Sequence, residues 1–177
     1  SGDIVLDIKE EEKKGLTVEL TDKKPIKENY ITLRLGNVSA PTNQSEAYHL
    51  EISANKIVLT ANAPQGMYSG VQTLLQLMRD AVFVDATEIT DWPAFTWRGF
   101  MVDVGRNYQS MKLLKQQIDA MAAYKLNVFH FHPTEDIAWR LQSKLYPQLT
   151  DPEFMLRDKG EYYTENDIKE LINYCKE

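Results

Sequence analysis

The chain has 177 residues, of which 43% are hydrophobic and 26% charged, and its formal net charge at pH 7 is −6. Domains average roughly 150 residues, so this length corresponds to one domain, or to one small domain plus part of a second. The composition is that of a folded globular protein and excludes a disordered chain. No apolar run approaches the roughly 20 residues that a membrane-spanning helix needs. The acidic balance argues against a partner made of nucleic acid, because neutralising phosphates requires a basic face.

The chain contains a single cysteine, Cys175. One thiol can form neither an internal disulfide nor a cysteine-based zinc site, and it leaves the redox compartment open. The first two residues, Ser1 and Gly2, are typical of the remnant of a cleaved tag. On that interpretation the native N-terminus, with any export signal, has been removed.

Apolar and polar residues alternate in the first half of the chain, which is typical of strands with one buried face. The alternating sets are Leu16, Val18 and Leu20, then Ile31, Leu33 and Leu35, then Tyr48, Leu50 and Ile52. A short apolar run at 57–59 follows after three polar or small residues, which predicts a hairpin. Apolar residues at helical spacing then predict a helix that begins near Pro64. Residues 3–80 are therefore expected to form a small α+β domain, with the charged stretch at 9–14 exposed to solvent.

The second half of the chain has a different pattern. Residues 90–93 read Thr-Asp-Trp-Pro, which predicts a linker because proline and its predecessor resist helix. Apolar strands are expected at 100–104 and 127–132, and helices are expected to begin at Ser110 and Thr164. Alternating strands and helices of this kind are typical of a parallel sheet.

The predicted domains are therefore residues 1–90 and 91–177. The strands of the second domain are apolar throughout, which favours burial on both faces, as in a barrel. A closed eight-stranded (β/α)8 barrel needs roughly 250 residues. The fold class is accordingly α/β, with a small α+β N-terminal domain followed by the first βα units of a truncated TIM barrel.

Polar residues that could bind a ligand or take part in a reaction gather where the predicted parallel strands end, which is where such folds carry their sites. Arg106 can hold a pair of sugar hydroxyls or a carboxylate through its planar fork, or form a structural ion pair. Glu135 and Asp136 are adjacent carboxylates that can polarise a histidine or exchange a proton, or lie on the surface as ordinary acids. Trp139 offers a flat apolar face for a pyranose ring, although tryptophan more often belongs to the core.

Two histidines, His130 and His132, point to the same face of a predicted strand. Such a pair could begin a metal site. No third ligand is apparent, so hydrogen-bonded packing histidines are favoured and no metal site is assigned. The sequence also lacks a glycine-rich phosphate loop, a G-x-S-x-G motif and a plausible Cys–His pair.

Several stretches resemble the start of the catalytic barrel of family 20 glycoside hydrolases, the β-N-acetylhexosaminidases. They are residues 97–108 (WRGFMVDVGRNY), 121–132 (MAAYKLNVFHFH), 139–140 (WR) and 146–150 (YPQLT). Upstream, residues 66–76 (GMYSGVQTLLQ) resemble the end of the N-terminal α+β domain of the same family. The resemblance implies an enzyme that releases terminal N-acetylhexosamine from glycans. It implies no metal or cofactor, and it favours export to a periplasmic, extracellular or lysosomal compartment over the cytoplasm.

The resemblance also implies roles for individual residues. Arg106 matches the arginine that binds the hydroxyls of the terminal sugar. Glu135 matches the first acid of an Asp-Asp pair, which in relatives orients a histidine that contacts the general acid. The implied supporting residues are Asp103, His132, Asp136, Trp139 and Arg140.

Family 20 enzymes use substrate assistance, an exception to the scheme with two catalytic carboxylates. The 2-acetamido oxygen of the sugar attacks the anomeric carbon, a glutamate is the general acid, and the aspartate before it holds the acetamido group. The chain contains no Asp-Glu dipeptide. The catalytic pair is therefore expected further along the parent protein, and the chain alone is expected to be inactive.

The chain departs from the usual sequence motifs of the family at several positions. Glu135 replaces an aspartate, Asn107 a histidine and Pro133 a leucine, while Ile137 and Ala138 replace Gln-Gly. These changes favour a divergent branch and keep open a non-catalytic carbohydrate-binding or structural relative. A different glycosidase with the same N-terminal domain, such as an α-glucuronidase, is disfavoured by the run KLNVFHFH.

A partial barrel leaves apolar strand edges and helix faces uncovered. The residues expected to lie in the unclosed sheet are Phe100, Val102, Phe129 and Phe131. Unpaired strands and large apolar patches recruit partners. The sequence therefore predicts self-association or local disorder beyond residue 95.

Overall fold

The computed structural model describes residues 4–9, 17–21, 30–79 and 84–176. The chain divides into two compact units, residues 1–96 and 97–177. The boundary expected after residue 90 falls inside a strand, Thr87–Asp91, whose last residue pairs with Tyr48 of the first unit. Of the charged stretch at 9–14, all but Lys9 lies outside the described residues, as does Leu16.

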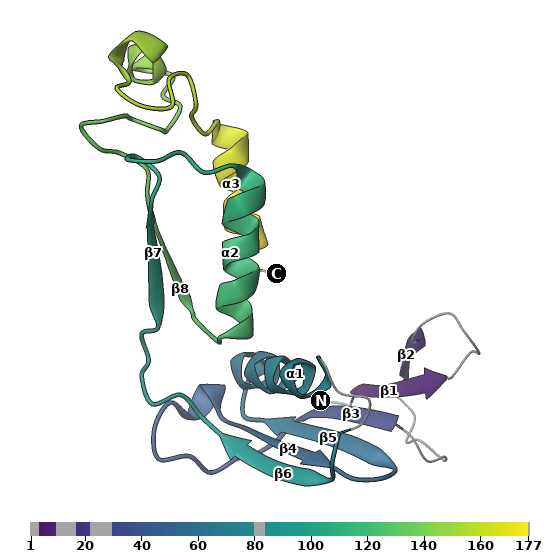
Figure 1. Ribbon diagram of the computed structural model, residues 1–177. Helices are drawn as coiled ribbons and strands as arrows, with labels where there is room; N and C mark the ends of the chain where they lie inside the picture. Colours follow the sequence, from purple (N-terminus) through teal and green to yellow (C-terminus); the bar gives the residue numbers. More distant parts are fainter. Residues whose placement is uncertain (1–3, 10–16, 22–29, 80–83, 177) are drawn as a thin grey trace. The chain divides into compact units, whose positions relative to one another are not determined.

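The first unit is a six-stranded sheet in the order β2-β1-β3-β5-β4-β6, with helix α1 on one face (Figure 1). Its elements are β1 (Ile4–Lys9), β2 (Thr17–Thr21), β3 (Tyr30–Leu35), β4 (Tyr48–Ile52), β5 (Lys56–Ala61), α1 (Pro64–Met78) and β6 (Thr87–Asp91). Every pairing is antiparallel except that of β3 with β5. The unit is the small α+β domain that the alternating pattern predicts.

The core of the first unit forms where α1 packs on β4 and β5. Alternation along β4 buries Tyr48, Leu50 and Ile52, which join Leu59 and Leu74 in one apolar cluster. The predicted hairpin between β4 and β5 is confirmed, and its turn is closed by the amide of Ser53 donating to the carbonyl of Lys56 at 2.9 Å.

Two glycines let α1 approach the sheet closely. A β-carbon at Gly66 would overlap the backbone carbonyl of Ala47, and one at Gly70 would overlap the side chain of Leu59. Pro64 occupies the first turn of α1, as expected, where its missing N–H costs no hydrogen bond.

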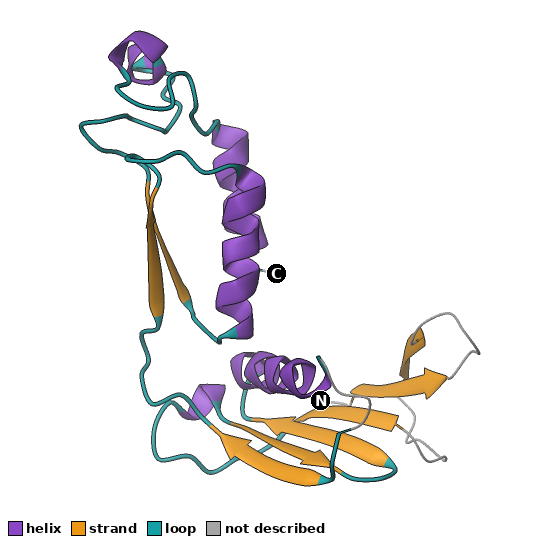
Figure 2. Ribbon diagram, viewed as in Figure 1, coloured by secondary structure: helices purple, strands orange, loops and turns teal. Residues whose placement is uncertain are grey.

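The second unit contains a parallel strand pair and two helices, drawn in orange and purple in Figure 2, and the helices pack on the strands. The two helices lie side by side, since the hydroxyl of Tyr174 in the second donates to Oδ1 of Asp119 in the first at 2.6 Å. Its elements are β7 (Gly99–Asp103), α2 (Met111–Ala123), β8 (Val128–His132) and α3 (Glu165–Tyr174), with short 3-10 turns at Pro147–Thr150 and Pro152–Phe154. Both helices begin where the sequence predicts, and both starts are capped: Ser110 accepts from the amide of Leu113, and Thr164 forms a reciprocal capping box with Asp167.

Helices cover one face of the β7–β8 pair. Val102 and Val104 are buried there with Leu114, Tyr163 and Leu171. Alternation turns Met101, Asp103, His130 and His132 to the opposite face, and Met101 is 52% exposed. The expectation that both faces are buried is therefore wrong for this part of the chain, because both helices pack on the same side.

Within the described ranges, which omit residues 1–3, 10–16, 22–29, 80–83 and 177, no helix has the length and apolar character needed to cross a membrane.

Candidate functional site

Just after β7, an arginine lies between two carboxylates, one from the last residue of that strand and one from the loop after β8. Nε of Arg106 lies 3.1 Å from Oδ2 of Asp103, and its Nη2 lies 3.1 Å from Oε1 of Glu135. The Arg106 amide also donates to Oδ1 of Asp103 at 3.0 Å, which ties the backbone to the same acid. The Arg106 side chain is nevertheless 60% exposed. The guanidinium is thus fixed in direction while its remaining N–H groups can meet a ligand.

Glu135 reaches Arg106 because the loops that follow β7 and β8 approach closely. A β-carbon built at Gly105 would lie 2.9 Å from that of Glu135. The amides of Val104 and Gly105 both donate to the carbonyl of His132, at 3.0 and 3.3 Å, which extends the pairing of the strands into these loops. A glycine at 105 is therefore a condition for the contact between Arg106 and Glu135.

His132 lies beside this pair. Its Nε2 is 2.8 Å from the carbonyl oxygen of Thr134 and 3.7 Å from Oε1 of Glu135. A carbonyl oxygen only accepts, so Nε2 carries a proton in this arrangement. His132 is therefore positioned as a donor at the edge of the carboxylate pair, while its neighbour on the same face, His130, is exposed.

The same residues bear on the question of a metal. One ligand atom each from Asp103, His132 and Glu135 lie within 4.8 Å of one another. The expectation that no third ligand is near is wrong for His132, because the fold places Asp103 of the neighbouring strand beside it together with Glu135, three residues further along the chain. Both carboxylates already pair with Arg106, however, and Nε2 of His132 donates to a carbonyl. These contacts make the cluster an ion-pair network in which the Arg106 guanidinium lies where a metal ion would bind the two carboxylates.

The other predicted supporting residues surround this network. Asp136 is exposed on the loop after β8. Trp139 is 39% exposed, and its Nε1 donates to the carbonyl of Leu141 at 2.8 Å, which fixes the plane of the ring. Arg98, the other arginine near β7, donates through Nε to the carbonyl of Lys125 at the entrance to β8.

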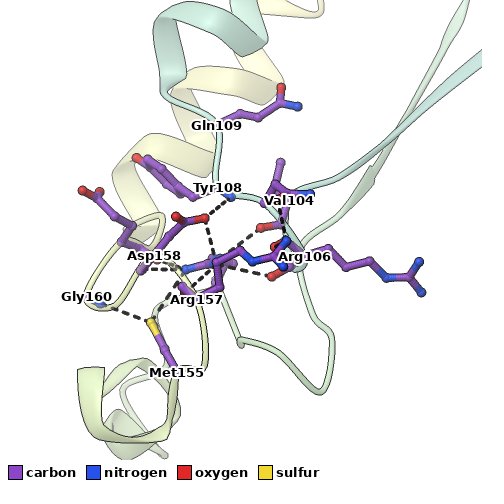
Figure 3. A network of polar contacts seen from close by, with 12 residues as sticks. Val104, Arg106, Tyr108, Gln109, Met155, Arg157, Asp158 and Gly160 are labelled. Carbon is purple, nitrogen blue, oxygen red and sulfur yellow. Dashed lines mark hydrogen bonds and ion pairs between the residues drawn. The ribbon is translucent and has the colours of Figure 1, made fainter.

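Arg140 is the largest fully buried side chain in the described ranges, and the sequence identifies it only as structural support. Its guanidinium donates to five backbone carbonyls, those of Val104, Gly105, Arg157, Asp158 and Glu161, at 2.9–3.3 Å (Figure 3). The Asp158 carboxylate lies 3.5 Å away and accepts from the amide of Tyr108 at 2.9 Å. One buried cation therefore joins the end of β7 to the loop at 155–161, and no local sequence pattern marks that connection.

Two tyrosines line the apolar side of this network. Tyr163 is fully buried, and its hydroxyl donates to the carbonyl of Gln109 at 2.6 Å. Burial raises the pKa of the Tyr163 phenol well above its ordinary value. The pKa of Tyr108 is raised as well, first by burial and then by the nearby charge of Glu161. Both side chains act as neutral packing groups behind the exposed residues.

Comparison with known families accounts for almost the whole chain. Residues 6–92 match the model described as glycosyl hydrolase family 20, domain 2, and residues 95–177 match the model of the family 20 catalytic domain. The chain belongs to glycoside hydrolase family 20. Its first unit is the family's N-terminal α+β domain, and its second unit is the start of the family's (β/α)8 catalytic barrel.

Individual relatives of this family 20 chain are β-hexosaminidases. It is 35% identical to one from Porphyromonas gingivalis over 76% of its own length and 36% identical to one from Vibrio furnissii over 77%. It spans only 19% and 25% of the length of these two relatives.

Solved structures show the same relationship. A chitobiase from Flavobacterium johnsoniae matches 93% of the chain with a TM-score of 0.71 and 32% identity, and the chain covers 25% of it. An exo-β-N-acetylglucosaminidase from Vibrio harveyi in complex with N-acetylglucosamine matches 81% with a TM-score of 0.67 and 30% identity, and the chain again covers 25%.

Proposed function

We propose that this chain is the N-terminal part of a β-N-acetylhexosaminidase that releases terminal N-acetylglucosamine or N-acetylgalactosamine from glycans with retention of configuration. The observation that carries the proposal is Arg106. Its exposed guanidinium is held by Asp103 and Glu135 at the end of the first barrel strand of a family 20 chain. The match to an enzyme structure in complex with N-acetylglucosamine supports the proposed substrate class.

Arg106 is the proposed sugar-binding residue. Its Nε and Nη2 are occupied by the two acids, while Nη1 has no partner among the residues that the structure describes. A planar fork of this kind suits a pair of neighbouring hydroxyls, which accept from two parallel N–H groups. The two acids together outweigh the single charge of the arginine, so a neutral sugar is a more suitable ligand than an anion.

The remaining chemistry is proposed to come from residues beyond this chain. By resemblance to the family, the acetamido group of the substrate attacks the anomeric carbon, and a downstream Asp-Glu pair orients it and protonates the leaving group. The residues in hand would bind and orient the sugar and exclude water beside it. Trp139, whose ring is fixed and half-exposed, is a candidate wall for that purpose.

The test is turnover of 4-nitrophenyl N-acetyl-β-glucosaminide and the matching galactosaminide by the whole protein and by residues 1–177 alone, each with and without Arg106→Ala. We expect release of nitrophenol by the whole protein only, with strong loss in the variant. Turnover by residues 1–177 that survives Arg106→Ala would indicate a contaminating host enzyme. Turnover by residues 1–177 that Arg106→Ala abolishes would contradict the proposed division of labour.

A non-catalytic carbohydrate-binding relative is the second candidate. It is motivated by Glu135, whose longer side chain replaces the expected aspartate and pairs with Arg106. Calorimetric titration with N-acetylglucosamine separates the two functions. Binding that depends on Arg106, without turnover by the whole protein, would favour this candidate over the enzyme.

A further inference from the structure

We propose that Arg157 is a positioning residue for Arg106, acting through the side chain of Asn107 and the backbone carbonyl of Arg106. The inference rests on the proposed role of Arg106 as the sugar-binding residue. It also assigns a role to Asn107, which replaces the histidine usual in the family: its side chain accepts a hydrogen bond from Arg157.

The contacts of Arg157 end on the segment that carries Arg106. Nη1 of Arg157 donates to Oδ1 of Asn107 at 2.7 Å and to the carbonyl oxygen of Arg106 at 3.3 Å. Arg157 is exposed, and no carboxylate pairs with it in the part of the chain that the structure describes. Its guanidinium is therefore held by these two acceptors rather than by a surface ion pair.

The backbone from which Arg157 extends is itself fixed. Nη2 of Arg140 donates to the Arg157 carbonyl at 3.0 Å, and Nη1 of Arg140 donates to the Asp158 carbonyl at 2.9 Å. The Asp158 carboxylate in turn accepts from the amide of Tyr108 at 2.9 Å. Residues 104–108 are thus held along their whole length, by Arg140 at the first two residues, by Arg157 at the next two and by Asp158 at the last.

Arg157 does not share a ligand position with Arg106. In Figure 3 the Arg106 side chain extends away from the network, whereas the labelled Arg157 lies within it. The head of Arg106 meets Asp103 and Glu135, while Arg157 touches the base of the residue at its carbonyl. The geometry therefore points to an effect on the direction of Arg106 and not to direct binding of the sugar.

Positioning matters because a misplacement of about 1 Å can lower the rate by roughly a hundredfold. Without Arg157, the segment 104–108 would keep the contacts of Arg140 and Asp158 at its two ends. It would lose those at the Arg106 carbonyl and the Asn107 side chain. We expect a partial effect, a fall in kcat/KM of about tenfold, with little change in overall stability because Arg157 and Asn107 are both exposed.

The experiment compares Arg157→Ala and Asn107→Ala with Lys159→Ala in the whole protein. Lys159 lies on the same loop, is exposed and loses the same charge, so it controls for electrostatics. We expect about tenfold lower kcat/KM for the first two variants, an unchanged melting temperature, and Lys159→Ala within about twofold of wild type.

The decisive comparison places Arg157→Ala in an Arg106→Ala background. If Arg157 acts through Arg106, it causes no further loss there. A further loss of about tenfold would show that Arg157 contacts the substrate itself and would overturn the inference. Wild-type kinetics in the Arg157→Ala single variant would overturn it as well.

A second readout does not depend on turnover, so it separates this inference from the proposed function. Amide hydrogen exchange at Arg106 and Tyr108 should accelerate in Arg157→Ala and not in Lys159→Ala, because both amides lie in the clamped segment. An inactive wild-type protein would contradict the proposed function alone. Unchanged exchange in Arg157→Ala would contradict the positioning role whether or not the protein is active.

Discussion

At the residue scale, Arg106 can either bind the sugar or only steady the end of the strand. Replacing it with lysine distinguishes these two roles. Lysine keeps the charge and loses the fork. Hydrogen bonds to a charged group contribute about 1.5–3 kcal/mol each when desolvated, and a loss of about 3 kcal/mol lowers kcat/KM by roughly a hundredfold. We therefore predict that Arg106→Lys in the whole protein lowers kcat/KM by roughly a hundredfold.

The same variant tests the structural role, which the ion pair with Asp103 keeps open. If Arg106 only steadies the strand end, Arg106→Lys lowers the melting temperature and leaves kcat/KM unchanged. Arg98 would then become the alternative sugar ligand. Its Nε already donates to the Lys125 carbonyl, which makes it the less suitable of the two.

Tyr163 predicts a pH dependence of stability. Burial raises the pKa of its phenol, so the unfolded chain releases the proton first as the pH rises. The stabilisation is fully present below the ordinary tyrosine pKa of about 10 and is lost above it, at a slope of about 1.4 kcal/mol per pH unit. Urea unfolding of wild type and Tyr163→Phe between pH 8 and 11 measures this loss as the difference between their free energies of unfolding.

In that experiment the variant should be less stable at pH 8, because Gln109 loses its partner, and the gap should narrow as the pH rises above 10. Tyr124→Phe removes a hydroxyl that belongs to a 79% exposed residue and is the matched control. Parallel pH profiles for wild type and Tyr163→Phe would show that the phenol does not titrate with unfolding.

The sequence predicts which residues gather at the candidate site better than it predicts the contacts that hold them there. Arg106 and Glu135 follow from the resemblance, and the strand register explains why Asp103 and His132 lie beside them. The role of Arg140 does not follow, because a buried arginine donating to backbone carbonyls leaves no trace in the identity of its partners. Arg157 and Asn107 are 50 residues apart, and only the fold of the 155–161 loop brings them together.

At the scale of elements, α1 depends on close approach to the sheet. Alanine is favoured over glycine in an exposed helix by about 1 kcal/mol. A methyl group at Gly66 would meet the backbone carbonyl of Ala47, which cannot move aside as a side chain can. We predict that Gly66→Ala destabilises the first unit by about 1–3 kcal/mol despite its better helix propensity.

Urea unfolding followed by circular dichroism measures this change, with Gln65→Ala on the exposed side of α1 as the control. A gain in stability for Gly66→Ala would mean that the helix can shift away from β4 at no cost.

Elements with strong local signals are predictable from the sequence, and pairings between distant segments are not. Alternation identifies β4, and the caps identify where α2 and α3 begin, because each signal lies within a few residues. The parallel pairing of β3 with β5 is not predictable in this way, since it joins strands separated by the β4 hairpin.

At the scale of the whole molecule, the uncovered face of the β7–β8 pair predicts self-association of residues 1–177. Met101 on that face is 52% exposed, and among the described residues each strand of the pair has one unpaired edge. Light scattering should show a mass that rises with concentration, and Met101→Lys, which charges the uncovered face, should reduce it. A monomer at all concentrations, with slow amide exchange throughout 97–132, would contradict this expectation.

We propose that the whole protein is a retaining β-N-acetylhexosaminidase whose substrate supplies the attacking oxygen. The most direct measurement is proton NMR of the reaction with 4-nitrophenyl N-acetyl-β-glucosaminide, run beside the corresponding β-glucoside, which lacks the acetamido group. We expect the β-anomer of N-acetylglucosamine to appear first and the β-glucoside not to be cleaved. First release of the α-anomer, or comparable cleavage of the β-glucoside, would contradict it.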